Sequence, residues 1–276
     1  MVPRPRTAVR AGMNGPVRSR AWLSVTVVVP VYRNAATLRV LHASLRRVLH
    51  AAAPAADILF VDDASPDDSL SVLESLARED PRVGVLRMVR NAGPHRAVLA
   101  GLAHARGAAA VLMDADLQDP PEAVPDLLAG LREGYDAVFA GRRGRYEAGD
   151  RLLVSRAYKR LMSVIAGTPP DAGMCVAVSR RMVDRLIEFR APRPNVVAMI
   201  GLSGLPFTSR PVTRNRRPVG ASAFSAWRRL RTGVSALTWA CVWRLAPALR
   251  RGGTGAAAAA PARAVSTASA LEDAPR

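Results

Sequence analysis

Two aspartates stand one residue apart at the end of an apolar run in the segment Val111–Glu122 (VLMDADLQDPPE). The run has the character of a buried strand, and Asp114 and Asp116 follow it directly. Carboxylates on alternate residues of a strand point to opposite faces, but where the chain turns they can converge on one cation. Mg²⁺ and Mn²⁺ prefer oxygen ligands, often carboxylates together with substrate phosphates. The pattern favours a metal site that bridges a diphosphate; the alternative is an Asp-rich turn that caps the next helix.

Apolar runs alternate with helical patterns around this segment. The runs predict strands at Val25–Val29, Ile58–Val61, Val83–Met88, Ala109–Met113 and Ala137–Ala140. The segments between them predict helices at Ala35–His50, Ser69–Glu79, Pro94–Arg106 and Glu122–Arg132. Strands separated by helices in this way form a mostly parallel sheet with helices on both faces, so the fold class is α/β and Rossmann-like.

Polar residues gather where three of these strands end. The segments are Pro30-Val31-Tyr32, Asp62-Asp63 and Asp114-Ala115-Asp116. Ligands of parallel sheets bind at the carboxyl ends of the strands, so we expect the three segments to form one site.

The pattern is weaker after residue 141. It predicts a helix over Asp150–Ile165, a strand over Met174–Val178, a helix over Ser179–Phe189 that begins with a cap, and an edge strand over Phe207–Val212 between prolines. The segment Ser222–Leu245 is amphipathic, with Arg set among Trp and Leu. It predicts either a helix docked on the core or a helix lying on an anionic membrane surface.

Composition narrows the class of protein. The 276 residues, 49% of them hydrophobic, suffice for one large core. Residues 1–20 carry a net charge of +5, residues 21–140 carry −4 and residues 141–276 carry +17. An acidic half joined to a basic half fits a phosphorylated partner or an anionic membrane surface. Nucleic acid is not the expected partner, because the arginines are scattered, aromatic residues make up only 5% and no nucleic-acid motif is present.

No secretory signal and no apolar stretch long enough to span a bilayer are apparent. We therefore expect a cytoplasmic protein, with peripheral contact to the cytoplasmic face of the membrane as an open alternative. Cys175 and Cys241 lie in apolar surroundings without metal-site spacing, which indicates reduced core residues.

Four segments together resemble the family 2 inverting glycosyltransferases of the GT-A fold, and within them the dolichol- or polyprenyl-phosphate mannosyltransferase-like branch. The segments are Val25–Leu38, Ile58–Ala77, Arg90–Gly107 and Ala108–Leu128. The resemblance covers roughly residues 24–145 and continues more loosely to about 230. It implies metal-dependent, inverting transfer of a hexose from a GDP- or UDP-sugar, with Mg²⁺ or Mn²⁺ as cofactor and polyprenyl phosphate as the leading acceptor.

Composition, which is rich in Pro, Arg, Gly and Ser at the start and in Ala at the end, predicts a domain organisation together with the resemblance. A disordered basic N-terminus would precede a catalytic domain with a nucleotide-sugar half and an acceptor half, followed by amphipathic helices and a disordered Ala-rich tail. The expected ranges are residues 1–20, 21–140, 141–220, 221–249 and 250–276.

The resemblance implies that residues at the ends of the first two strands bind the nucleoside of the donor. Pro30, Tyr32, Asp62 and Asp63 would hold its base and ribose. Asn34 stands where the family usually has an acidic residue, and an amide can still form a hydrogen bond at that position.

The resemblance implies that the Asp-rich segment binds the diphosphate and the sugar of the donor. Asp114 would contact the ribose or the sugar, while Asp116 and Gln118 would bind the metal. A departing diphosphate needs compensation of its charge, which a metal and arginines supply.

The resemblance also implies roles for three more residues, which would contact the phosphates or the acceptor. Arg142 matches an arginine that contacts phosphates, and Arg151 stands near a second basic position of that kind. Asp171 matches an aspartate of the acceptor-side turn and is the best candidate for a general base if the acceptor is a hydroxyl. A lipid phosphate is already anionic and needs no base.

One departure from the family bears on the acceptor. Polyprenyl-phosphate enzymes usually carry a Gly-x-Ser-Lys-aromatic motif where this chain has GASAFS (Gly220–Ser225), so Ala223 replaces the lysine. Arg217, Arg228 or Arg229 could substitute for it, although arginine and lysine are not equivalent phosphate ligands. A hydroxyl of a soluble or secondary-metabolite acceptor is therefore the alternative substrate.

Two other classes of protein remain open at this point. A nucleotidyltransferase also pairs aspartates with an α/β sheet, but it would be expected to show a Gly-rich phosphate loop after the first strand, and PVYRNAAT contains none. A non-catalytic nucleotide-sugar-binding module would not need to keep Asp116, Gln118 and Arg142.

Overall fold

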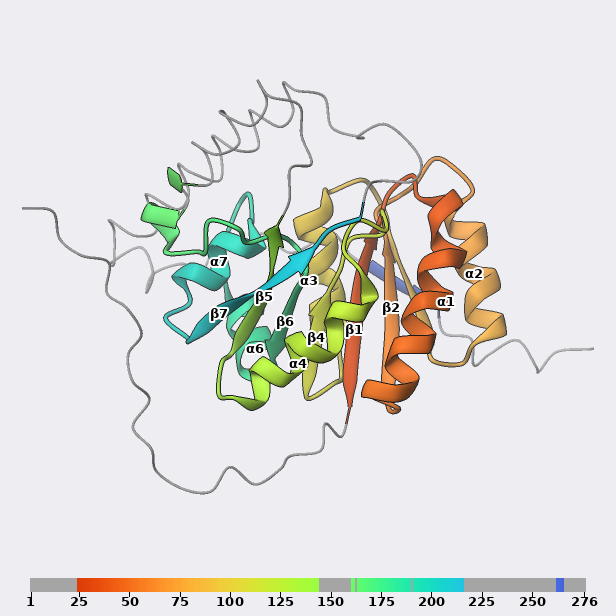
Figure 1. The fold of residues 1–276 in the computed structure, drawn as a ribbon. Helices are drawn as coiled ribbons and strands as arrows, with labels where there is room; N and C mark the ends of the chain where they lie inside the picture. Colours follow the sequence, from red (N-terminus) through yellow and green to blue (C-terminus); the bar gives the residue numbers. More distant parts are fainter. Residues whose placement is uncertain (1–23, 144–159, 162, 190, 216–261, 266–276) are drawn as a thin grey trace, which may run out of the picture.

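An eight-stranded sheet runs through the computed structural model, which describes residues 24–143, 160–161, 163–189, 191–215 and 262–265 (Figure 1). The strands are β1 (Val25–Val31), β2 (Ala56–Asp62), β3 (Val83–Met88), β4 (Ala109–Leu112), β5 (Ala137–Arg143), β6 (Val176–Ser179), β7 (Phe207–Thr213) and β8 (Ala262–Val265). They lie in the order β7-β5-β6-β4-β1-β2-β3-β8. The pairs β4-β1, β1-β2, β2-β3 and β5-β7 are parallel, which confirms the mostly parallel α/β fold.

Helices cover both faces of the sheet (Figure 1). One face carries α1 (Ala35–Ala52), α2 (Ser69–Glu79), the 3-10 turn η1 (Pro121–Ala123) and α4 (Val124–Arg132). The other face carries α3 (Pro94–His104), α6 (Arg180–Glu188) and α7 (Val196–Leu202). Each layer buries its own apolar cluster, so the sheet separates two cores.

The sequence explains why these elements form. All seven residues of β1 are buried, as expected for a central strand with helices on both faces. In α1, Leu38, Leu41, Leu45 and Leu49 recur at helical spacing and are buried against the sheet. Apolar packing of this kind stabilises a domain by about 25 cal/mol per Å² of buried apolar surface, so the central strands form a rigid platform for the loops that follow them.

The second half of the sheet differs from a simple alternation of parallel strands. β6 lies between β5 and β4 and is antiparallel to both, so β5 and β7 run in the same direction as β4. β7 is an edge strand, as its prolines predict. The Ser179 hydroxyl accepts a hydrogen bond from Met182 N at 3.1 Å, which confirms the predicted cap of α6.

Two elements have no counterpart among the predicted ones. α7 is a seven-residue apolar helix without a polar stripe, and its clearest signal is the cap formed by Asn195 Oδ1 with Ala198 N at 3.0 Å. β8 lies inside the tail that we expected to be disordered, and pairs with β3 in antiparallel register from Val85↔Val265 to Met88↔Ala262. The pairing covers the backbone groups of β3, which would otherwise form the sheet edge.

Several predicted segments lie outside the described residues: the N-terminus 1–20, most of the helix Asp150–Ile165 and the amphipathic segment Ser222–Leu245. Among the described residues, none of the helices combines the length and the apolar character needed to cross a membrane.

Candidate active site

The three polar segments meet at one edge of the sheet. β1, β2 and β4 are parallel neighbours, with Val31 paired to Asp62 and Val28 paired to Leu112. The segments that follow these strands therefore leave the sheet at the same side, which confirms the expected common edge. β5 and β7 end at this edge too, since they run parallel to β4.

Left-handed backbone marks the loop after each of the four parallel strands β1 to β4. The residues concerned are Arg33 (φ 59°), Ala64 (φ 53°), Gly93 (φ 91°) and Leu117 (φ 60°). Only the glycine adopts this conformation without cost; for the others it costs about 1–2 kcal/mol each. Strained backbone of this kind often accompanies functional sites, where the surrounding structure holds it in place.

The loop after β1 is fixed by hydrogen bonds from its own amides. Asn34 Oδ1 accepts a hydrogen bond from Tyr32 N at 3.1 Å, and Asn34 N donates to Ser69 Oγ at 3.0 Å. Arg33 N donates to Ser65 Oγ at 3.3 Å. The Asn34 side chain thus closes the turn that presents the half-buried Tyr32, a role that an acceptor oxygen of an acidic residue could fill equally.

Asp62 and Asp63 use their carboxylates to shape the neighbouring loops. Asp62 accepts a hydrogen bond from Ser65 N at 3.2 Å, and Asp63 accepts from Ala92 N and Gly93 N at 2.7 and 2.8 Å. Burial raises the pKa of both carboxyl groups, and these hydrogen bonds oppose the increase. Asp63 is only 2% exposed, so its described contacts are internal. A contact of either residue with a nucleoside stays a prediction, as it does for Pro30, which is buried within β1.

The Asp-rich segment forms a half-exposed loop, which we call the metal loop (Asp114–Asp119). Asp114, Asp116 and Gln118 are all partly accessible. Asp116 Oδ1 accepts a hydrogen bond from Gln118 N at 3.1 Å, so the two predicted metal ligands are directly linked. The buried Thr37 hydroxyl donates to Ala115 O at 2.7 Å and ties the loop to the first turn of α1.

The far end of the metal loop is tied to the residues after β7. Arg214 donates from Nε and Nη2 to the two carboxylate oxygens of the buried Asp119, at 2.6 and 3.0 Å. Asn215 N donates to Gln118 O at 2.9 Å. Sequence reasoning did not identify Arg214 or Thr37, since nothing in the local pattern links either residue to the aspartates.

Asp171, the aspartate predicted for the acceptor side, lies against β5. Asp171 Oδ1 accepts a hydrogen bond from Ser209 Oγ at 3.1 Å, and its other oxygen approaches Gly141 so closely that a Cβ there would lie 2.2 Å from it. Asp171 is therefore at the same sheet edge as the metal loop. Arg142 follows Gly141 in β5, but its side chain lies outside the described part, as does the whole of Arg151.

The chemistry of the metal loop fits a magnesium or manganese ion only in part. Within the described ranges, no group of three His, Cys, Asp or Glu side chains is placed to hold a metal ion. Asp116 and Gln118 offer one carboxylate and one amide oxygen, both hard donors of the kind that Mg²⁺ and Mn²⁺ accept. A cation at this loop would therefore take its remaining ligands from a bound diphosphate or water.

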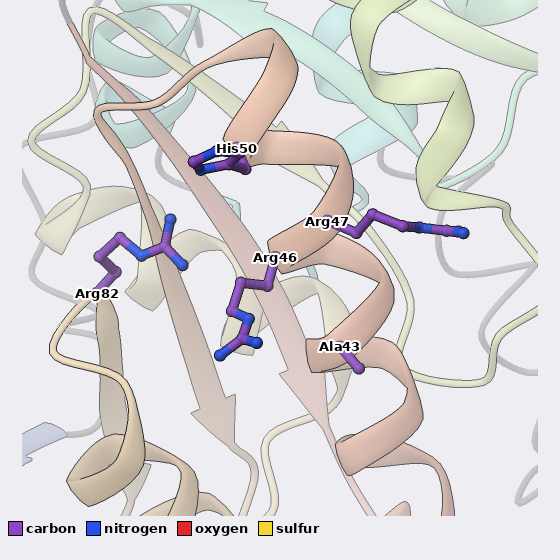
Figure 2. A pocket seen from close by; sticks show the side chains of 5 residues that line it. All are labelled: Ala43, Arg46, Arg47, His50 and Arg82. Atoms are coloured by element: carbon purple, nitrogen blue, oxygen red, sulfur yellow. The ribbon is translucent and has the colours of Figure 1, made fainter.

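A basic pocket lies at the opposite, amino-terminal edge of the sheet. Figure 2 shows Arg46, His50 and Arg82 around this open cavity of about 460 Å³, while Arg47 extends away from them. Arg82 donates to both oxygens of Asp80, at 3.2 and 3.1 Å, and Arg47 is paired with Glu122. Because two of its guanidinium charges are compensated internally, the pocket is not a strong anion site.

Comparison with known proteins decides the family. A model described as Glycosyl transferase family 2 matches residues 26–187, more than half of the chain. The chain belongs to glycosyl transferase family 2. It is thus a glycosyltransferase.

Curated relatives of the enzyme include two bacterial examples. It is 29% identical over 219 residues to the uncharacterized glycosyltransferase YkcC of Bacillus subtilis (strain 168), covering 78% of this chain and 68% of that protein. It is 36% identical over 170 residues to an undecaprenyl-phosphate 4-deoxy-4-formamido-L-arabinose transferase of Shewanella sediminis (strain HAW-EB3), covering 59% of this chain and 50% of that protein. The chain spans about half to two thirds of the length of such relatives.

Solved structures share the fold. A mannosyltransferase from Pyrobaculum calidifontis, in complex with GDP-Man and Mn²⁺, aligns with a TM-score of 0.59 at 24% identity, over 83% of this chain and 64% of that one. Glucosyl-3-phosphoglycerate synthase from Mycobacterium tuberculosis, in complex with Mn²⁺, UDP-glucose and phosphoglyceric acid, aligns with a TM-score of 0.56 at 20% identity, over 78% and 80%. At these identities the likeness concerns the GT-A-like fold alone.

Proposed function

We propose that this family 2 enzyme transfers a hexose, with inversion, from a GDP- or UDP-sugar to a polyprenyl phosphate, in a reaction that requires Mn²⁺ or Mg²⁺. The observation that carries the proposal is the metal loop. Asp116 and Gln118 are linked to each other, partly accessible, and held at the edge where parallel α/β sheets bind their ligands.

The donor would lie across the loops that follow β1, β2 and β4. Tyr32 and Asn34 lie at the part of the edge next to β1 and β2, where the base and ribose would bind, and the buried Asp62 holds the loop beside them. Asp114 would face the ribose or the sugar, because it stands at the start of the metal loop. A bound cation would neutralise the diphosphate as it leaves, held by Asp116 and Gln118. Arg142, at the end of β5, would add a second positive charge.

The acceptor would approach from the side of β5 and β7. A phosphate group is an anion near neutral pH and attacks the anomeric carbon without a base, while the bond from that carbon to the diphosphate oxygen breaks. The names of the undecaprenyl-phosphate transferases among the relatives support this class of acceptor.

A hydroxyl acceptor is the second candidate, and two observations favour it. Ala223 stands where the polyprenyl-phosphate branch usually has lysine. Asp171 is half-buried and accepts a hydrogen bond from Ser209, which fixes its position beside β5, where it would take the proton of an attacking hydroxyl.

A transfer assay separates the two candidates. The full-length protein is incubated with GDP- and UDP-hexoses and Mn²⁺, and with undecaprenyl phosphate or undecaprenol as matched acceptors with and without the phosphate. Mass spectrometry detects the product, and NMR assigns its anomeric configuration. We expect a glycosyl phospholipid of inverted configuration from the phosphate alone, and at least about a 100-fold lower rate for Asp116→Ala.

Other outcomes are equally informative. Transfer to undecaprenol or to a soluble hydroxyl compound, without transfer to the lipid phosphate, would replace the proposal by the second candidate. An unchanged rate in Asp116→Ala or in excess chelator would refute the metal-dependent mechanism.

A further inference from the structure

The metal loop and the end of β7 are joined by two separate contacts. The first is the ion pair between Arg214 and Asp119, in which guanidinium Nε donates to Oδ1 and Nη2 donates to Oδ2 of the carboxylate. Such bidentate pairs fix geometry as well as charge. The second is the backbone hydrogen bond from Asn215 N to Gln118 O at 2.9 Å. Both partners of the ion pair are shielded from water, with Asp119 1% and the Arg214 side chain 10% exposed.

The pKa of Arg214 is set by the negative charges of the metal loop. Burial by itself would lower the pKa of Arg214, but the neighbouring charge of Asp119, and after it those of Asp116 and Asp114, raise the pKa above its ordinary value. The pairing of Arg214 with Asp119 keeps the guanidinium at the base of the loop.

We propose that Arg214 and Asp119 are positioning residues, which hold the metal loop so that Asp116 and Gln118 face one cation. This inference rests on the proposed metal–diphosphate function. Neither residue needs to touch the cation or the donor.

The loop depends on such support for a geometric reason. Leu117 adopts a left-handed backbone conformation that its side chain disfavours, so the loop holds this shape only where its surroundings impose it. Thr37 fixes the loop at Ala115, and the Arg214 contacts fix it at Gln118 and Asp119. Mg²⁺ in particular requires near-ideal octahedral geometry, so a small displacement of one ligand weakens its binding.

β7 offers a matched control. Arg210 lies within β7, the strand that ends directly before Arg214, and forms an ion pair with the exposed Glu133 of the turn after α4. Substitution of Arg210 removes an arginine and an ion pair from β7 and leaves the Asp119 contacts in place.

The experiment measures how strongly Mn²⁺ and the nucleotide assist each other's binding. Calorimetry gives the Kd of GDP and of UDP for the full chain, once with Mn²⁺ and once in EDTA, and the ratio of the two values is the metal coupling. Coupling between two ligands is typically 5- to 150-fold. We expect Arg214→Met and Asp119→Asn to reduce the wild-type coupling at least about fivefold, Arg214→Lys to retain part of it, and Arg210→Met to retain all of it. The Kd in EDTA should stay within about twofold of wild type.

Two results would overturn the inference. One is an unchanged metal coupling in the Arg214 and Asp119 variants. The other is an equal loss of nucleotide affinity with and without Mn²⁺, which would make Arg214 a direct ligand of the donor. Circular dichroism at the assay temperature checks the fold, and Arg214→Lys keeps the test decisive if Arg214→Met does not fold, since it retains the charge but loses the bidentate geometry. Failure of the proposed function has a different signature, namely no effect of Mn²⁺ in the wild-type protein.

Discussion

Replacement of Gly141 by alanine tests the placement of Asp171 at the acceptor side. A Cβ at this position would lie 2.2 Å from Asp171 Oδ2 and 2.4 Å from Ser209 Oγ. Ordinary van der Waals contact begins at 3.4 Å, so the carboxylate must retreat by about 1 Å or turn away from β5. Its hydrogen bond from Ser209, 3.1 Å long, cannot survive such a movement intact.

The size of the effect follows from this displacement. Overpacking of one methyl group costs about 1–3 kcal/mol of stability, which a domain of this size tolerates. A misplacement of about 1 Å at a reacting group costs about 100-fold in rate. We therefore expect Gly141→Ala to fold, to melt several degrees lower, and to lose about 100-fold in kcat for transfer to a hydroxyl acceptor, for which Asp171 is the proposed base, with a much smaller change in the KM of the nucleotide sugar. Transfer to a lipid phosphate, which needs no base, should change much less.

The assay is steady-state transfer with the acceptor that the wild-type enzyme uses, together with thermal denaturation of each variant. Gly84→Ala is the matched control, because its new methyl group would meet only the flexible end of Leu59, at 3.2 Å. Asp171→Asn serves as reference for the loss of the carboxylate itself. Wild-type kcat of Gly141→Ala toward a hydroxyl acceptor, or the same loss in Gly84→Ala, would refute the assignment of Asp171 as the base.

Three further predictions concern the metal loop and the framework. Thr37→Val removes the donor to Ala115 O and should lower the free energy of unfolding by about 1–3 kcal/mol in chemical denaturation. Thr37→Ser keeps the hydroxyl and should retain most of the wild-type stability. Equal losses of stability in the two variants would contradict the role of the hydroxyl. Hydrogen bonds from Arg82, with those from His42, lower the pKa of Asp80 to about 2 against burial, so its contribution to stability is complete above its ordinary pKa of 3.8 and is lost as the pH falls through 2. The stability gap between wild type and Asp80→Asn should therefore shrink between pH 4 and 2 in urea titrations, and a constant gap would disprove the ion pair. EDTA should abolish transfer and excess Mn²⁺ should restore it; full activity in EDTA would exclude a metal requirement.

Much of the framework could be predicted from local sequence patterns, because those patterns are physical causes of the elements. A β-branched run such as Val25–Val29 is stable only between two helical layers, and the leucine spacing of Ala35–His50 creates the stripe that covers it. The polar residues after β1, β2 and β4 could be placed at one edge since parallel neighbours end on the same side. The edge position of β7 followed from its prolines.

What could not be predicted depends on contacts distant in the chain. Arg214 meets Asp119 across 95 residues, and Ser209 meets Asp171 across 38. No local periodicity encodes such pairs, and a chain with 40 basic residues offers many arginines of equal promise. The antiparallel direction of β6 was hidden for the same reason, because an apolar run looks alike in either direction. The hydrogen bonds that Asp63 accepts could not be predicted either, since their donors, the amides of Ala92 and Gly93, come from the next loop.

The central claim is that a cation at Asp116 and Gln118 meets the diphosphate of the donor. Electron–nuclear double resonance of Mn²⁺ measures it directly, with the protein in excess over Mn²⁺ and the bound nucleoside diphosphate. We expect a ³¹P hyperfine coupling from phosphate oxygens on the protein-bound ion, and loss of this protein-bound species in Asp116→Ala. A protein-bound Mn²⁺ without ³¹P coupling, or an identical spectrum from Asp116→Ala, would contradict the account.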